Sequence, residues 1–86
     1  MKPKLIIRKT IIDRHELFSI ISEARSAMMD HATRQARENK RTAEEIRYAQ
    51  CDADARAVLM ARTCMRVHTF EEALEIIKDN VDIEVV

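Results

Sequence analysis

The most constraining feature of this 86-residue chain is that it contains no glycine and only one proline, Pro3. Glycine supplies most backbone conformations with positive φ, and tight turns and loops that approach a phosphate closely depend on it. Its absence excludes the phosphate-binding loop, the dinucleotide-binding fingerprint and the nucleophile elbow. A chain with so few turn-forming residues has few connections, and long helices meet that condition best.

The length of the chain limits it to one hydrophobic core. At 86 residues, burial of apolar surface only just offsets the loss of chain entropy, so a second copy of the chain could add useful burial. Apolar residues make up 47% and charged residues 35% of the sequence, a composition typical of a folded domain with a solvated surface. With no repeat, low-complexity tract or linker in the sequence, we expect residues 1–86 to form a single domain.

Apolar runs and cysteines predict a compartment. The longest apolar run, residues 57–61, is far shorter than the roughly 20 residues of a membrane span, and the basic N-terminal residues adjoin no run of signal-peptide length. On one helix, Cys51 and Cys64 would lie about 20 Å apart along the axis, too far for a disulfide. Reduced thiols fit a reducing compartment, so we expect a soluble cytoplasmic protein with no membrane partner.

Hydrophobic alternation predicts a strand at each end of the chain. Residues 4–12 are rich in β-branched side chains, and apolar and acidic side chains alternate in residues 81–85. Basic residues gather at the N-terminus and acidic residues at the C-terminus, which favours pairing of these strands. Two strands form a marginal sheet, so either residues 63–68 supply a third strand or a second copy completes the sheet. This is the main reason to expect a homodimer.

Three helices are predicted between the strands. Each begins at a pair of residues with the spacing of a capping box: Asp13 with Glu16, Thr42 with Glu45, and Thr69 with Glu72. Apolar stripes at helical spacing follow each pair, so we predict a helix over residues 14–38, a polar break at 39–41, a second long helix and a short third one. The pattern leaves open whether residues 63–68 are helix or strand.

These elements predict an α+β fold. Alanine-lined stripes allow the first two helices to approach closely, because small side chains bring two backbones together. We therefore expect a long antiparallel helical hairpin plus a short C-terminal helix, packed on a small sheet formed by the N- and C-terminal strands.

No group of residues makes a strong case for catalysis or metal binding. Cys64 and His68 are four residues apart, which on a helix would direct both toward one ion. The residues that could complete such a site are His15, His31 and Cys51. No recognised ligand spacing is present, and Cys64 also fits the apolar stripe as a small buried residue. We therefore predict no metal, no cofactor and no catalytic residue.

A basic cluster is the best candidate for contact with phosphates. It lies at the expected turn between the long helices and consists of Arg34, Arg37, Lys40 and Arg41. Against nucleic-acid binding, the net charge of the chain is zero and it has only three aromatic residues. A solvated helix end is therefore the favoured interpretation of this cluster.

Four methionines divide into two pairs. Met28 and Met60 fall on the predicted buried stripes, whereas Met29 and Met65 do not, so an exposed apolar patch there would mark a partner site. We expect a small homodimeric protein-binding or regulatory protein, an adaptor that acts through a helical surface on a protein partner. The alternative is a nucleic-acid-associated regulator that uses the basic cluster, and the second alternative is a small enzyme with a site at a dimer cleft.

Overall fold

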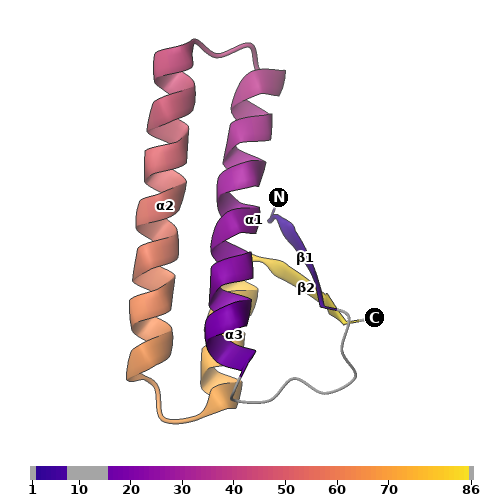
Figure 1. Cartoon of the computed structure of the whole chain (residues 1–86), viewed down its shortest axis with the longest axis vertical. Coiled ribbons are helices and arrows are strands. Elements are labelled where there is room, and N and C mark those ends of the chain that lie inside the picture. The colour runs from indigo at the N-terminus through magenta and orange to yellow at the C-terminus, as the bar shows by residue number, and fades with distance from the viewer. Residues whose placement is uncertain (1, 8–15, 86) are drawn as a thin grey trace.

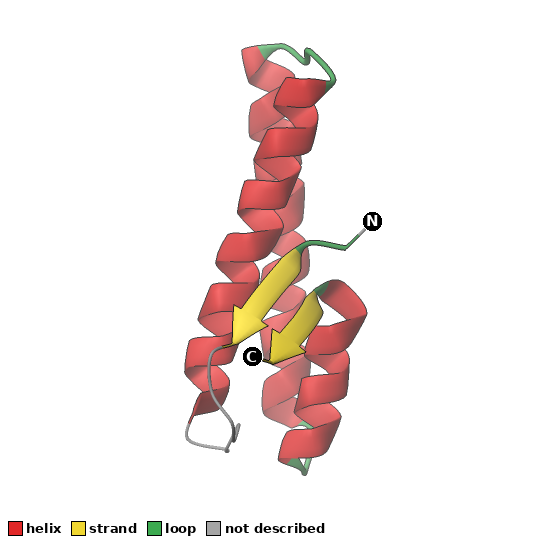
Figure 2. Ribbon diagram, turned by 90° about the vertical axis from the view of Figure 1, so that its right-hand side faces the viewer, coloured by secondary structure: helices red, strands yellow, loops and turns green. Residues whose placement is uncertain are grey.

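The computed structural model describes residues 2–7 and 16–85, and in these the protein is mostly helical with a small sheet (Figure 1). The elements follow in the order β1 (Lys4–Ile7), α1 (Leu17–Glu38), α2 (Ala43–Arg66), α3 (Phe70–Asn80) and β2 (Asp82–Val85). The long helices α1 and α2 lie side by side and are joined by a short turn at one end (Figure 1). Toward the other end, α3 packs on both long helices, and β1 packs on α1 while β2 lies between β1 and α3 (Figure 2).

This arrangement divides the pair of long helices into two regions. We call residues 17–28 and 57–66 the base, because α3 and the sheet pack there. We call residues 29–56, which include the turn, the tip. Among the described residues, two side-chain hydrogen bonds join α1 to α2: the Arg25 Nε donates to the Asp54 carboxylate at 2.7 Å, and the Gln50 amide donates to the Thr33 hydroxyl at 3.0 Å.

The strands pair in parallel, with Lys4 opposite Asp82 and Leu5 opposite Ile83. Pairing of the two chain ends was predicted and is confirmed, and the Lys4 ammonium lies 3.9 Å from the Glu84 carboxylate across the strands. Both side chains of that ion pair are exposed, so it contributes at most about 1 kcal/mol. The predicted N-terminal strand ran to residue 12, but its part beyond Ile7 lies outside the described residues.

The turn between the long helices uses a backbone conformation that usually belongs to glycine. Lys40 has a φ of 54°, and its N–H donates to the Arg37 carbonyl at 3.0 Å while the N–H of Arg41 donates to the Ala36 carbonyl at 3.0 Å. These two bonds form the Schellman arrangement that ends a helix. The polar break predicted at residues 39–41 is confirmed, and a lysine takes the left-handed position at its centre.

Two of the three predicted helix starts are confirmed. The Thr42 hydroxyl accepts from the Glu45 N–H, and the Glu45 carboxylate accepts from the Thr42 N–H, both at 3.2 Å. At α3 the Thr69 hydroxyl accepts from the Glu72 N–H at 3.1 Å. The third predicted cap, at Asp13, lies outside the described residues, as does the predicted beginning of the first helix at residue 14.

The structure answers the question that the sequence left open about residues 63–68. Residues 63–66 form the last turn of α2, and the chain leaves the helix at Val67. The alternative of a third strand here was wrong, because the apolar stripe of α2 continues to a buried Cys64. The described residues therefore contain two strands.

The hydrophobic core lies at the base. Its largest fully buried side chains are Ile77 and Val81. The buried cluster around them draws on β1 and the three helices, with Val81 directly after α3: Leu5, Ile7, Ile20, Ile21, Ala24, Met28, Ala57, Met60, Cys64, Ala73, Ile77 and Val81. The partly buried Ile83 of β2 packs against it. Met28 and Met60 belong to it, as predicted. In the tip, the buried side chains are the two alanines Ala36 and Ala53.

Candidate interaction surfaces

One side of α2 faces away from the core and is exposed along the length of the helix. Its seven members, which we call the outer stripe, recur at spacings of three and four residues and so share one helical face: Glu44, Tyr48, Cys51, Ala55, Leu59, Arg62 and Arg66. All seven are exposed, whereas Ala53, Ala57, Met60 and Cys64 on the opposite side are buried. The apolar members lie in the middle of the stripe and the charged members toward its ends.

Large apolar side chains are exposed at several places on the molecule. Tyr48 is 69% exposed and Leu59 66%, and both belong to the outer stripe. Among the described residues, the others are Ile6, Phe18 and Met65. Single exposed apolar side chains are common, but two large ones on one helical face form a candidate contact surface.

Of the two methionines predicted to contact a partner, Met65 is exposed and Met29 is half-buried. Met65 lies near the end of α2 beside the outer stripe, so it could extend that surface. Met29 is on α1, and its partial burial leaves less of its side chain for contact. Exposure therefore favours Met65 over Met29 as a residue that contacts a partner.

The predicted basic cluster is at the tip, and its four members are all exposed: Arg34, Arg37, Lys40 and Arg41. Arg41 is paired with Glu45 at 3.3 Å. Arg34, Arg37 and Lys40 form no ion pair with any other described residue. Exposed carboxylates of Glu38 and Glu44 lie in the same part of the chain, so the tip carries both signs of charge.

The described residues considered for a metal site differ in burial and do not form one site. Cys64 is buried, its thiol donates to the Ala73 carbonyl at 3.5 Å, and burial raises the pKa of that thiol. His68 and Cys51 are exposed, Cys51 on the outer stripe. His15 lies outside the described residues. Among the residues that are described, no three histidine, cysteine or acidic side chains gather to hold an ion.

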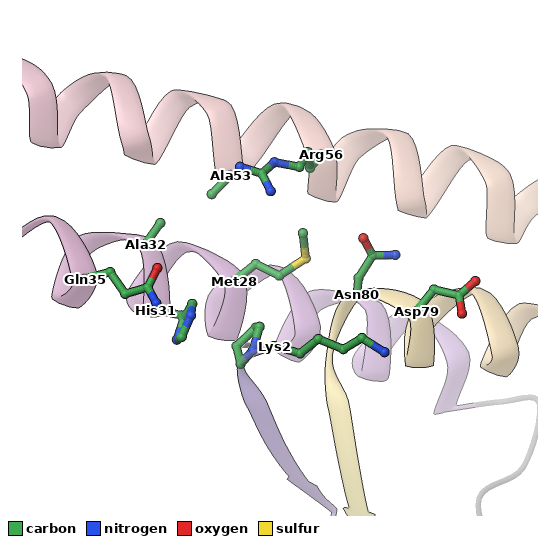
Figure 3. Close-up of a pocket in the computed structure, with 10 residues that line it drawn as sticks. Lys2, Met28, His31, Ala32, Gln35, Ala53, Arg56, Asp79 and Asn80 are labelled. Atoms are coloured by element: carbon green, nitrogen blue, oxygen red, sulfur yellow. The ribbon is translucent and has the colours of Figure 1, made fainter.

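A cavity of about 270 Å³ lies where the N-terminal segment meets α1, α2 and the end of α3 (Figure 3). His31 lines it, and the His31 Nε2 is buried without a hydrogen-bond partner among the described residues. Asp79 is the one carboxylate among the described residues that line it. Figure 3 shows His31 and Asp79 at opposite ends of the cavity, with Lys2 between them. This arrangement does not give the paired histidine and carboxylate that a general acid or base would use.

Two polar side chains at this cavity are already engaged. Lys2 donates from its Nζ to the Lys78 carbonyl at 3.1 Å, and Arg56 pairs with Asp52. Their charges are therefore only partly available to a ligand.

The prominence of Tyr48 and Leu59 was missed by sequence reasoning, although a signal for it exists. The predicted buried stripe of α2 fixes the orientation of the helix, because residues three or four apart share one side of it and residues two apart lie on nearly opposite sides. Leu59 directly precedes the buried Met60 and therefore lies off the buried stripe. It is four residues after Ala55, on the same exposed face. A leucine on the solvent side of an amphipathic helix would have identified the outer stripe.

No helix in the described part of the chain combines the length and apolarity needed to span a membrane. No protein-family model matches this sequence, and neither a curated protein nor a solved structure is significantly similar to the chain.

Proposed function

We propose that this chain is a small homodimeric protein-binding or regulatory protein, an adaptor that acts in the cytoplasm through a helical surface of its antiparallel hairpin. The observation that supports this most is the exposure of Tyr48 and Leu59 at the middle of the outer stripe. Removing apolar surface from water contributes about 25 cal/mol per Å², so a partner that covers these side chains gains directly from them. Tyrosine is also enriched among the residues that dominate binding interfaces.

The sheet gives weaker support for the homodimer than its two strands suggested. A two-stranded sheet is marginal alone, but packing against a helix can stabilise it. Leu5 and Ile7 are buried in the same cluster as Ile20 of α1 and Ile77 of α3. The sheet therefore has support within the chain, and the outer stripe becomes the stronger reason to expect a partner.

A sedimentation experiment with a capture step tests this proposal. The native chain should sediment as a dimer at micromolar concentration and retain a protein partner from a lysate of its host. A variant with Tyr48→Ser and Leu59→Ser should lose the dimer contact, the contact with the captured protein, or both. Ile6→Ser removes a large exposed side chain from β1 instead and is the matched control, expected to behave like the native chain. A native chain that is monomeric and captures no protein contradicts the proposal.

The second candidate is a nucleic-acid-associated regulator that uses the basic cluster. It is favoured by the exposed charges of Arg34, Arg37 and Lys40 at the tip, which form no ion pair with another described residue. Each phosphate contact on a duplex adds about 0.9 to the slope of log affinity against log salt concentration. Arg34→Gln with Arg37→Gln should therefore lower that slope by about 2. Binding that is undetectable at low salt, or insensitive to salt, excludes this candidate.

A further inference from the structure

The outer stripe of α2 is symmetric about its central residue, Ala55. Its other members form three pairs whose partners are equally far from Ala55, at eleven, seven and four residues: Glu44 and Arg66, Tyr48 and Arg62, and Cys51 and Leu59. When two copies of a helix pack antiparallel about a two-fold axis at Ala55, each residue therefore meets the other member of its pair. The chemistry of these pairs then decides whether such packing is favourable.

All three pairs are complementary. Glu44 in the first turn of α2 would face Arg66 in the last turn of the second copy, which joins opposite charges. Tyr48 would face Arg62, and a guanidinium over an aromatic ring is a favourable cation–π contact. The remaining pair is apolar, and alanine at the axis lets the two backbones approach closely.

Within the described part of the chain, no ion pair uses the charges that these contacts need. Glu44, Arg62 and Arg66 form no ion pair with another described residue, whereas Asp52 and Arg56 beside the stripe pair with each other. Parallel packing of the same stripe would place Glu44 against Glu44 and Arg66 against Arg66. Like charges in contact are destabilising, so the charge pattern favours the antiparallel arrangement.

We infer that a second copy of this chain docks along the outer stripe, antiparallel, with the two-fold axis at Ala55. This inference rests on the homodimer of the proposed function and specifies its interface. The contact would run for about 33 Å along α2, from Glu44 to Arg66. The two tips, with their basic clusters, would then lie at opposite ends of the dimer, and the sheets would remain outside the interface.

Cysteine cross-linking tests this geometry directly. Ala55→Cys in a Cys51→Ser background places two thiols at the axis, and mild oxidation should convert most of the chain to a disulfide-linked dimer on a non-reducing gel. In the native chain the two Cys51 thiols would be about 12 Å apart along the axis and should not cross-link. Leu59→Cys places a thiol opposite the native Cys51 of the second copy, and these two thiols should cross-link.

Two results would overturn the inference. One is efficient cross-linking through native Cys51, which indicates parallel packing. The other is a chain that sediments as a dimer while neither Ala55→Cys nor Leu59→Cys cross-links, which places the interface elsewhere, for example at a sheet edge. In both cases the homodimer itself survives, whereas a native chain that is monomeric at micromolar concentration removes the proposed homodimer as well.

Charge reversal provides an independent test. Glu44→Arg or Arg66→Glu alone sets like charges opposite each other at both ends of the interface and should raise the dimer dissociation constant about tenfold. The double variant exchanges the charges and should return the constant to within about threefold of the native value. Circular dichroism of each variant checks that α2 is retained. Additive weakening in the double variant, or no effect in any of the three, contradicts the antiparallel pairing.

Discussion

The base and the tip of the long helices are built from the same kind of amphipathic helix but are stabilised very differently. At the base, Ile20, Met28 and Met60 pack with Ile77 of α3 and with β1 in one buried cluster. At the tip, the buried side chains are Ala36 and Ala53, and neither belongs to that cluster. An alanine buries far less apolar surface than isoleucine or methionine, so the base supplies most of the hydrophobic stabilisation.

This difference shows how a small chain can combine a stable core with an extended surface. A region that buries few apolar side chains opens locally at lower free energy than the global unfolding transition. The tip is therefore held mainly by helix capping and by contacts such as that between Thr33 and Gln50. The outer stripe crosses both regions, with Tyr48 in the tip and Leu59 in the base.

The largest expected effect is from truncation of the base core. Ile77→Ala removes a side chain with no exposed surface and should lower the free energy of unfolding by about 2 to 5 kcal/mol, because it leaves a cavity. The same change at Ile6, which is 52% exposed, should cost less than about 1 kcal/mol. Urea unfolding of both variants measures this. Equal effects would mean that the base is not where burial stabilises the chain.

A smaller effect is expected at the cap of the tip. Thr42→Ala removes the hydroxyl that accepts from the Glu45 N–H and should lower the free energy of unfolding by about 1 kcal/mol. Thr42→Ser keeps an accepting hydroxyl and is the control. Hydrogen exchange should show the loss first in the opening turn of α2, while the amides of α3 keep their protection. Equal loss of protection in α3 would indicate that tip and base unfold as one unit.

Substitution of the left-handed residue at the tip should stabilise the chain, by a free energy similar to or smaller than that lost in Thr42→Ala. Lys40 adopts a φ of 54°, which costs a residue with a Cβ roughly 1 to 2 kcal/mol. Glycine avoids that cost but loses more entropy on folding, so Lys40→Gly should raise the free energy of unfolding by about 0.5 to 1 kcal/mol. Asn39→Gly, at a residue with negative φ, should not stabilise. Thermal unfolding compares the two variants.

Local features were predictable from the sequence because their causes are local. The capping box of Thr42 and Glu45 depends on residues three apart, and the buried stripe of α2 depends only on the helical period. Pairing of the first and last strands followed from their opposite charges. These interactions are specified by short-range spacing or by net charge, which a single sequence contains.

Other features depend on tertiary structure and could not be predicted. The direction of strand pairing is set by the path of the chain through α3, which brings Asp82 back beside Lys4. The cavity at His31 exists because the N-terminus crosses α1 at that level. The left-handed residue of the turn is Lys40 and not its neighbour Asn39, although asparagine adopts that conformation more readily. Each outcome is decided by contacts between distant segments or by turn geometry.

Acidic pH should destabilise the tip, at the first turn of α2. The Thr42 N–H and hydroxyl beside Glu45, together with Arg41, hold the pKa of that carboxyl below its ordinary value of 4.5. Because the folded pKa is the lower one, the stabilisation is present above pH 4.5 and is lost as the pH falls through the folded value. Glu45→Gln cannot titrate and should remove this pH dependence. Helicity of the opening turn of α2, followed by hydrogen exchange between pH 3 and 6, measures it.

Alkaline pH should destabilise the base, because the pKa of the Cys64 thiol is also shifted. Burial raises the pKa of the Cys64 thiol from its ordinary value of 9.0. Its stabilisation is therefore fully present below pH 9 and is lost as the pH rises toward the folded pKa, because the unfolded chain releases the proton more easily. Cys64→Ala should lower the free energy of unfolding at neutral pH and flatten its decline above pH 9. Cys51→Ala removes an exposed thiol and leaves the buried core intact, so it is the matched control. If the two variants respond alike, the alkaline loss does not originate in the base core, and the contrast between the two regions would then rest on hydrophobic burial alone.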